Sequence, residues 1–169
     1  MTALKKGFTL IELLIVIAIL GVLAVVVLVA INPVQQLART RDAGRISTVS
    51  QLGHAVEAYF VSHDGTYPTA ATWSADLTTS GDLSVVPAEV TNTLTTPCGT
   101  NEVNGWCYVA GTDSFALWSA LEADTNLEVD PAACGGTAAF ASYLSLAGKA
   151  CTVCDTPPAA GDNDSVCDN

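Results

Sequence analysis

Basic residues are much rarer than acidic residues in this sequence. Six Lys and Arg stand against 17 Asp and Glu, and after Arg45 the only basic residue is Lys149. Contacts to nucleic-acid phosphates require Lys and Arg, and anionic membrane surfaces attract the same side chains. The composition therefore argues against direct nucleic-acid binding by the part of the chain beyond Arg45, and against adhesion of that part to anionic membranes.

Motifs of the common enzyme classes are missing as well. The sequence contains no G-x-S-x-G, no P-loop, no H-E-x-x-H and no dinucleotide-binding fingerprint. Its two histidines, His54 and His63, fall on one predicted helix or at its end, where exposed helix positions are a better interpretation than catalytic bases. No nucleophile–base pair stands out, so we predict a protein that is not an enzyme.

Cysteine is absent from the first 97 residues, and all six cysteines follow. Such clustering is typical of an oxidising compartment. Cys151 and Cys154 form a C-x-x-C, which alone suggests a redox or zinc site, but no second C-x-x-C follows and no histidine lies nearby. We therefore expect disulfides, and proximity in sequence favours these pairs: Cys98 with Cys107, Cys134 with Cys151, and Cys154 with Cys167.

The sequence is organised around an apolar run near its N-terminus, KKGFTLIELLIVIAILGVLAVVVLVAI over residues 5–31. The uncharged part from Leu13 to Ile31 is about 19 residues, which as a helix matches the roughly 30 Å core of a bilayer. Glu12 is unusual there, because a carboxylate at membrane depth costs on the order of 2.5–3.5 kcal/mol. Cleavage between Gly7 and Phe8 would free an amine that could pair with Glu12 in the same or a neighbouring copy.

Residues 5–14, KKGFTLIELL, resemble the processing site of type IV pilins and type II secretion pseudopilins. The resemblance implies a leader, residues 1–7, that a prepilin peptidase removes after Gly7, methylation of the new N-terminal Phe8, and a role for Glu12 in assembly. An ordinary signal peptide has a shorter apolar region, and a plain signal anchor leaves Glu12 and the Gly-Phe junction unexplained. The segment from Arg39 to Arg45 and the Gly65-Thr-Tyr-Pro68 turn extend the resemblance to about the first 70 residues.

The expected fold is α+β and pilin-like, with a long N-terminal helix packed on a small antiparallel sheet and a disulfide-braced C-terminal region. The transmembrane or filament-core helix covers residues 8–33, with a break at Pro33 and a softer point at Gly21. The predicted globular domain, residues 34–169, has an amphipathic helix at 34–63 that stops at His63-Asp64-Gly65, a loop at 64–97, and the sheet and C-terminal loop at 98–169.

Within the sheet region the clearest pattern is a hairpin. Trp106 to Ala110 and Phe115 to Leu121 read as two strands around a four-residue loop. In the second strand, Phe115, Leu117, Ser119 and Leu121 should share one face, and Ala116, Trp118 and Ala120 the other. Residues 127–129 would add a third strand, and residues 140–146 fit either a strand or a short helix.

Two sets of charged residues permit more than one interpretation. Arg39, Arg41 and Arg45 could pair with acidic groups on adjacent subunits, or form a solvated helix face with Asp42 as local partner. Acidic residues of the C-terminal loop, Asp162 and Asp164 among them, and the run from Asp124 to Asp130 could supply oxygen ligands to calcium. The sequence does not reproduce a calcium-loop pattern, so solvated acidic surface is preferred and no cofactor is predicted.

The sequence thus predicts a filament subunit that is inserted in the inner membrane as a prepilin, with its N-terminus inside and its globular domain outside the cytoplasm. Its expected partners are copies of itself, the prepilin peptidase, an inner-membrane assembly platform and minor pilins. A pseudopilin of a type II secretion or DNA-uptake system is the alternative within this class. A membrane-tethered extracytoplasmic binding module, with the acidic tail as its ligand or calcium site, is the alternative from another class.

Overall fold

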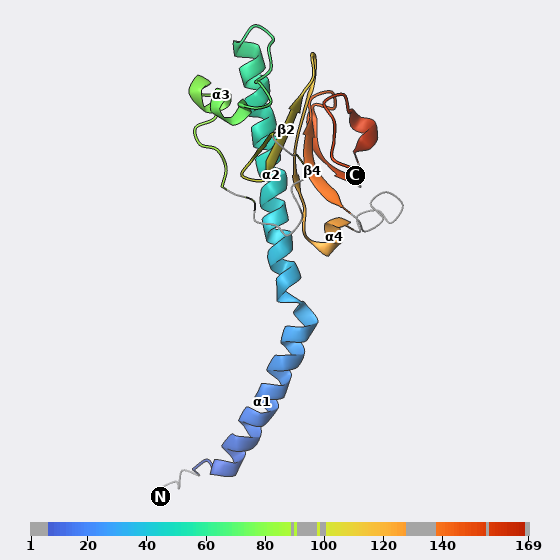
Figure 1. The fold of residues 1–169 in the computed structure, drawn as a ribbon. Coiled ribbons are helices and arrows are strands. Elements are labelled where there is room, and N and C mark those ends of the chain that lie inside the picture. The colour runs from blue at the N-terminus through green and yellow to red at the C-terminus, as the bar shows by residue number, and fades with distance from the viewer. Residues whose placement is uncertain are drawn as a thin grey trace, which may run out of the picture. The chain divides into compact units, whose positions relative to one another are not determined.

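The computed structural model describes residues 7–88, 90, 98, 101–127, 138–154 and 156–167. The chain divides into two compact units, residues 1–37 and residues 38–169, which are described separately here. We call residues 38–169 the head. Figure 1 shows the helices and strands that make up each unit.

The first unit consists mainly of one apolar helix, α1 (Leu10–Ile31), in which no residue is buried. The helix runs without interruption through Gly21. The helical stretch that it begins includes a segment long and apolar enough to cross a membrane, by length and composition. The predicted membrane-spanning run therefore does form a helix, and its apolar side chains are not buried by any described residue.

A break separates α1 from the next helix, α2 (Pro33–Ser62), as the sequence predicts. The residue in the non-helical conformation is Asn32, whose backbone is left-handed with φ 46° and ψ 74°. Asparagine tolerates this conformation better than most residues. Proline suits the first position of the following helix, where its missing N–H is not needed.

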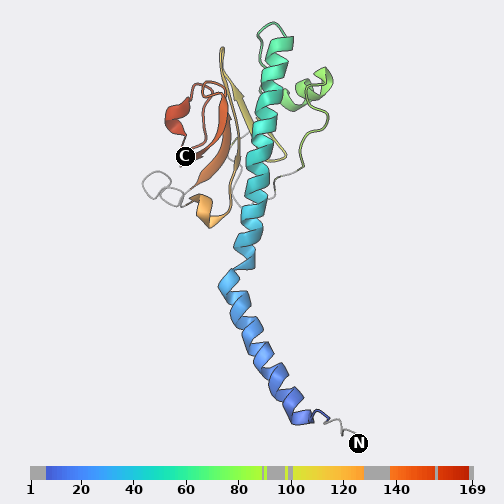
Figure 2. The same cartoon turned by 180° about the vertical axis from the view of Figure 1, so that it is seen from behind.

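In the head, α2 lies along one face of the sheet, with α3 (Trp73–Ser80) on the side away from β4 and β5 (Figures 1 and 2). Val49, Leu52 and Val56 are fully buried at helical spacing and belong to the same core cluster as residues of the sheet. The helix ends as predicted, because Gly65 adopts a positive φ of 76° and its N–H donates to the carbonyl of Phe60.

The sheet is a five-stranded antiparallel meander in which every strand pairs with its neighbour in sequence. Its strands are β1 (Glu102–Val103), β2 (Trp106–Ala110), β3 (Phe115–Ala120), β4 (Ala139–Leu144) and β5 (Lys149–Cys154). The predicted hairpin is confirmed as β2 and β3. Residues 140–146, which fitted either a strand or a helix, contain most of β4.

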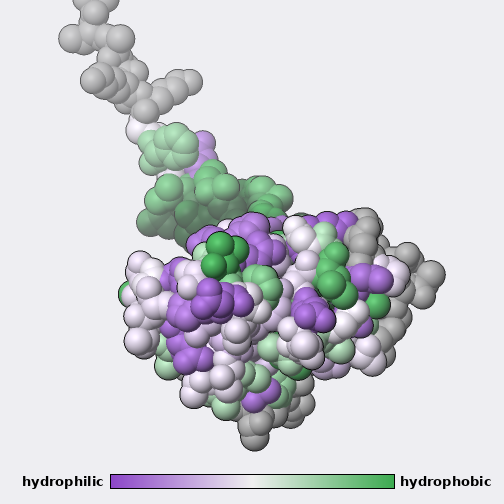
Figure 3. Space-filling model, turned by 90° about the horizontal axis from the view of Figure 1, so that it is seen from above, coloured by the Kyte–Doolittle hydropathy of each residue, from purple (hydrophilic) through white to green (hydrophobic). Residues whose placement is uncertain are grey.

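The two faces of β3 bury different side chains, as its alternating pattern predicts. Phe115 and Leu117 belong to the core cluster beneath α2, whereas Ala116 and Trp118 belong to a second cluster on the other face. With both faces covered, little apolar surface remains. Seen from above in Figure 3, the head is mostly hydrophilic or intermediate, with small hydrophobic patches.

Two connecting segments differ from their predictions where the structure describes them. The predicted loop 64–97 contains the eight-residue helix α3, because Trp73 and Leu77, four residues apart, are both fully buried. Residues 127–129 were expected in a strand, but Leu127 ends a short helix, α4 (Asp124–Leu127), and residues 128–129 lie outside the described residues.

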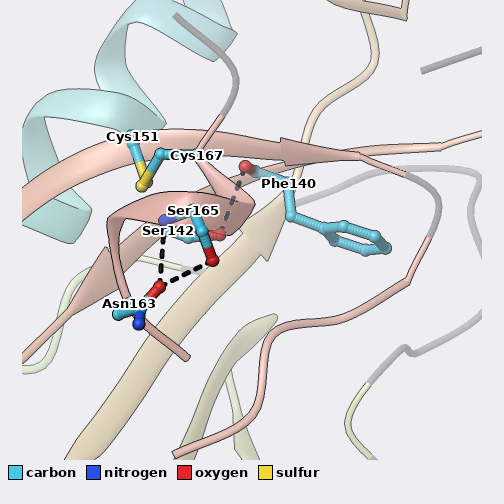
Figure 4. The surroundings of a disulfide bond; sticks show 6 residues. All are labelled: Phe140, Ser142, Cys151, Asn163, Ser165 and Cys167. Atoms are coloured by element: carbon cyan, nitrogen blue, oxygen red, sulfur yellow. Dashed lines mark hydrogen bonds between the residues drawn. A yellow bond between two sulfur atoms is a disulfide. The ribbon is translucent and has the colours of Figure 1, made fainter. Parts of the chain in front are cut away.

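The disulfides correct the predicted pairing. Cys98 pairs with Cys107 as expected, but Cys151 pairs with Cys167 (Figure 4), so the pairs Cys134–Cys151 and Cys154–Cys167 are wrong. Cys154 is also disulfide-bonded, and Cys134 lies outside the described residues.

Strand geometry is the reason for this correction. Cys151 and Cys154 are three residues apart on β5, so their side chains point to opposite faces. Cys151 packs against the cluster on the outer face of the sheet, together with Cys167, whereas Cys154 packs against the core beneath α2. The C-x-x-C therefore does not form a redox pair or a metal chelate.

Two glycines of α2 test how closely this helix packs on the sheet. A Cβ at Gly53 would overlap the ring of Tyr143 on β4, whereas a Cβ at Gly44 would meet nothing within 4 Å. We expect Gly53→Ala to destabilise the head by about 1–3 kcal/mol, and Gly44→Ala to stabilise it by about 0.5–1 kcal/mol.

Urea unfolding of the detergent-solubilised chain measures both changes. Tryptophan fluorescence reports on the head alone, since Trp73, Trp106 and Trp118 all belong to it. Equal stability of the two variants would contradict the close contact between Gly53 and Tyr143.

Candidate functional site

The predicted processing junction lies just before α1. Gly7, Phe8 and Thr9 precede the first helical residue and are exposed, with Phe8 81% exposed. A Cβ at Gly7 would meet nothing within 4 Å. The peptide bond between Gly7 and Phe8 is therefore outside the helix and uncovered by other described residues.

Thr9 and Glu12 form a capping box at the start of α1. The Thr9 backbone N–H donates to Glu12 Oε2 at 2.8 Å, and the Thr9 hydroxyl donates to the same oxygen at 2.8 Å. In return, the Glu12 N–H donates to Thr9 Oγ1 at 3.3 Å. These contacts satisfy backbone donors that no helical carbonyl can reach.

The capping box gives Glu12 a local partner that our sequence analysis did not consider. Only the amine that cleavage would free was considered there as a partner for this carboxylate. The signal was present in the sequence as Thr-x-x-Glu directly before an apolar run. Thr9 is therefore a functional candidate that the sequence reasoning missed.

The basic turn of α2 is a second candidate, and the structure places its residues in a buried charge cluster. Asp42 is 1% exposed and Arg45 is 5% exposed. Arg45 Nη1 donates to Asp42 Oδ1 at 2.7 Å, and Arg45 Nη2 donates to Glu122 Oε1 at 3.0 Å. Arg41 Nε also donates to Glu122 Oε1, at 2.5 Å.

Asp42 connects α2 to the segment that follows β3. Its carboxylate accepts the backbone N–H groups of Glu122 and Ala123, at 3.1 and 2.8 Å, and the side-chain amide of Asn126 at 2.6 Å. A carboxylate with this many donors is well compensated for its burial. The cluster therefore fixes one end of α2 in the head to the end of β3.

This cluster revises both interpretations of the arginines. Arg45 does have Asp42 as its local partner, but it is buried rather than on a solvated face. Arg41 and Arg45 both pair with Glu122 of their own chain. Arg39 is exposed and forms no ion pair with any described residue. Glu122 and Asn126 were missed because they lie about 80 positions away in sequence.

Two opposing effects set the pKa of Glu122. Burial raises the pKa, but the hydrogen bond from Arg41 and the positive charges of Arg45 and Arg41 outweigh it, so the pKa lies below its ordinary value. Glu122 is therefore an anion at neutral pH, as its two arginine contacts require.

The other predicted candidates do not form a site in the described part of the chain. His54 and His63 are exposed, and they contact Glu57 and Tyr59 respectively. Asp162 accepts the backbone N–H of Ala159 at 2.7 Å, and the side chain of Asp164 is not described. Within the described residues, no three His, Cys, Asp or Glu side chains gather as metal ligands. The preference for a solvated acidic surface over a calcium site in the C-terminal loop stays a prediction.

The described residues combine an exposed Gly-Phe junction, an apolar helix without a buried residue, and a head in which α2 packs on an antiparallel sheet. This is the arrangement that the resemblance to type IV pilins implies. Residues 3–28 match the family described as the prokaryotic N-terminal methylation motif. No solved structure matches the chain significantly.

Two similar curated proteins are fimbrial proteins of Neisseria meningitidis. The one from serogroup A, serotype 4A, is 37% identical over 62% of this chain and 64% of its own length. The one from serogroup B is 40% identical over 57% of this chain and 56% of its own length. The chain thus spans less than two thirds of either relative. Together, the motif and these relatives support the type IV pilin family for this protein.

Two substitutions separate the buried part of the charge cluster from its exposed part. Asp42→Ala leaves Arg45 without one of its carboxylates and three donors without an acceptor, so we expect a loss of about 3–5 kcal/mol. Arg41→Ala removes a side chain that is 46% exposed, and should cost much less, because an exposed ion pair adds little stability.

Urea unfolding with tryptophan fluorescence gives both free energies. A loss below about 1 kcal/mol for Asp42→Ala would contradict the structural role of the cluster.

Proposed function

We propose that this protein is the structural subunit of a type IV pilus or a closely related filament. The observation that carries the proposal is the exposed apolar surface of α1, most of which lies within the matched methylation motif. Such a helix needs either lipid or other copies of itself around it. The similarity to fimbrial proteins favours a pilus subunit over a pseudopilin of a secretion or DNA-uptake system.

In this proposal, the newly made precursor is inserted in the inner membrane. The N-terminus lies in the cytoplasm, α1 spans the bilayer, and the head lies outside the cytoplasm. The disulfides Cys98–Cys107 and Cys151–Cys167 support this side for the head, because such bonds persist in oxidising compartments. An inner-membrane assembly platform and minor pilins would then move subunits from the membrane into the filament.

A prepilin peptidase is the proposed processing enzyme, which cuts after Gly7 and methylates Phe8. The exposure of this junction supports the proposal, because a protease needs an accessible bond outside regular structure. The small Gly7 residue leaves the approach to the bond open.

Glu12 is the proposed assembly residue. Cleavage creates an ammonium group on Phe8, next to the Thr9 N–H that Glu12 already binds. In a filament, this carboxylate would pair with the Phe8 ammonium of a neighbouring copy and so align the two helices. The pair would also neutralise a charge that is otherwise costly in an apolar environment.

Replacing Gly7 tests the processing step. Gly7→Val puts a branched side chain at the junction, and the precursor should remain uncut, which a gel shows as an unshifted band. Gly21→Ala is the matched control, since a Cβ there also meets nothing within 4 Å, and it should be cut normally. Mass spectrometry of sheared surface filaments should find methylated Phe8 as the first residue. A filament subunit that still carries Met1 would contradict the proposal.

Two further variants separate the charge of Glu12 from its capping role. Glu12→Gln keeps a side chain suited to the capping box but loses the charge. The variant precursor should still be cut after Gly7. It should form at least about tenfold fewer filaments, which corresponds to a lost interaction of about 1.4 kcal/mol per subunit. Thr9→Ala weakens the cap by about 1 kcal/mol but keeps the charge, and should assemble nearly normally. Electron microscopy of sheared filaments measures the yield. Normal assembly of Glu12→Gln would eliminate the charge-pairing role.

A further inference from the structure

The C-terminal loop of the head, residues 156–167, has no part in the proposed function. It ends at Cys167, which is joined to Cys151 of β5 with their Cα atoms 5.5 Å apart. Figure 4 shows Asn163 and Ser165 of this loop close to each other and near the disulfide. Both residues are exposed. The loop therefore presents these two side chains to solvent from a covalently fixed position.

Asn163, Asp164 and Ser165 form the tripeptide Asn-x-Ser. Of the seven asparagines in the sequence, only Asn163 is followed by Ser or Thr two residues later. N-glycosylating transferases require this spacing, because they act on the asparagine amide and also bind the hydroxyl two residues on, with any residue except proline between.

The geometry of the loop brings the two required groups together. The Ser165 hydroxyl donates to Asn163 Oδ1 at 2.7 Å, and the Ser165 N–H donates to the same oxygen at 3.0 Å (Figure 4). Both bonds use the oxygen of the amide. The nitrogen, Nδ2, makes no hydrogen bond to any described residue, so the reacting atom is left accessible.

Other asparagines of the head differ in this respect. The side-chain nitrogen of Asn104 donates to the Pro87 carbonyl at 3.0 Å, and that of Asn126 donates to Asp42 at 2.6 Å. Their nitrogen atoms hold the fold together. The side-chain nitrogen of Asn163 makes no such bond to the described residues.

We propose that Asn163 is an N-glycosylation site. The donor is a saccharide linked through pyrophosphate to a polyprenyl lipid, and a membrane-bound transferase catalyses the step outside the cytoplasm. A bond forms between Asn163 Nδ2 and C1 of the sugar, while the bond from C1 to the pyrophosphate oxygen breaks. The pyrophosphate leaves with the electron pair, and Nδ2 gives up one proton.

The surroundings of Asn163 accommodate an added saccharide. A Cβ at neighbouring Gly161 would meet nothing within 4 Å, so there is open space beside the loop. Asp162 accepts the backbone N–H of Ala159 at 2.7 Å and donates its own N–H to the Ala159 carbonyl at 3.1 Å. These bonds hold the approach to Asn163 in a defined turn without covering its side chain.

Mass spectrometry of the full chain from its own organism tests the site. We expect the peptide containing Asn163 to carry a saccharide mass increment, with fragment ions that place it on Asn163. The increment should be lost in Asn163→Gln and in Ser165→Ala, and kept in Ser165→Thr, which retains the hydroxyl. Asn101→Gln is the matched control, because Val103 stands two residues after Asn101, and it should leave the increment unchanged.

Three outcomes would overturn the proposal. They are an unmodified Asn163 in the native protein, an increment that persists in Ser165→Ala, and fragment ions that place the saccharide on the Ser165 hydroxyl. None of them bears on filament formation, so failure here is distinguishable from failure of the proposed function.

Discussion

The feature on which the rest of the structure depends is the exposed apolar surface of α1, in which no residue is buried. Eighteen large apolar side chains between Phe8 and Ile31 are exposed. At roughly 1.5–3 kcal/mol for each buried side chain, keeping them all in water would cost several tens of kcal/mol. That exceeds the roughly 5–15 kcal/mol by which a typical domain is stable. In the proposed function, lipid and later other subunits would surround this helix. The head must then fold through contacts of its own.

The head meets this requirement through a core of its own and a polar anchor at one end of α2. Val49, Leu52 and Val56 supply the apolar contact with the sheet, and Asp42 and Arg45 supply the anchor at the end nearer the N-terminus. Buried ion pairs add little net stability, but removal of one partner is costly. The buried charge cluster thus specifies how α2 packs against the end of β3. It also pairs Arg41 and Arg45 with Glu122 of the same chain, so these arginines are not free to contact other subunits.

The parts of this structure that the sequence predicts are those encoded locally. The apolar run and the alternation of Phe115 to Leu121 each lie within one short stretch, so periodicity was sufficient. The pairing of Cys151 with Cys167 depends on the face of the sheet to which Cys151 points. That face is set by the register in which β5 pairs with β4. The contacts of Glu122 with Arg41 and Arg45 join residues 81 and 77 positions apart. No local pattern carries that information.

The atoms of Glu12 connect the isolated subunit with the proposed filament. Both bonds from Thr9 go to Oε2, and Oε1 accepts no hydrogen bond from any described residue. One oxygen therefore caps the helix while the other is available to a neighbour's ammonium. Local capping reduces the cost of holding the carboxylate in an apolar helix before assembly, because two donors already compensate part of its charge. The Phe8 ammonium of a neighbouring copy would then add to these bonds without breaking them. The N-terminal cap of α1 would persist while the new ion pair sets the axial alignment of the two helices.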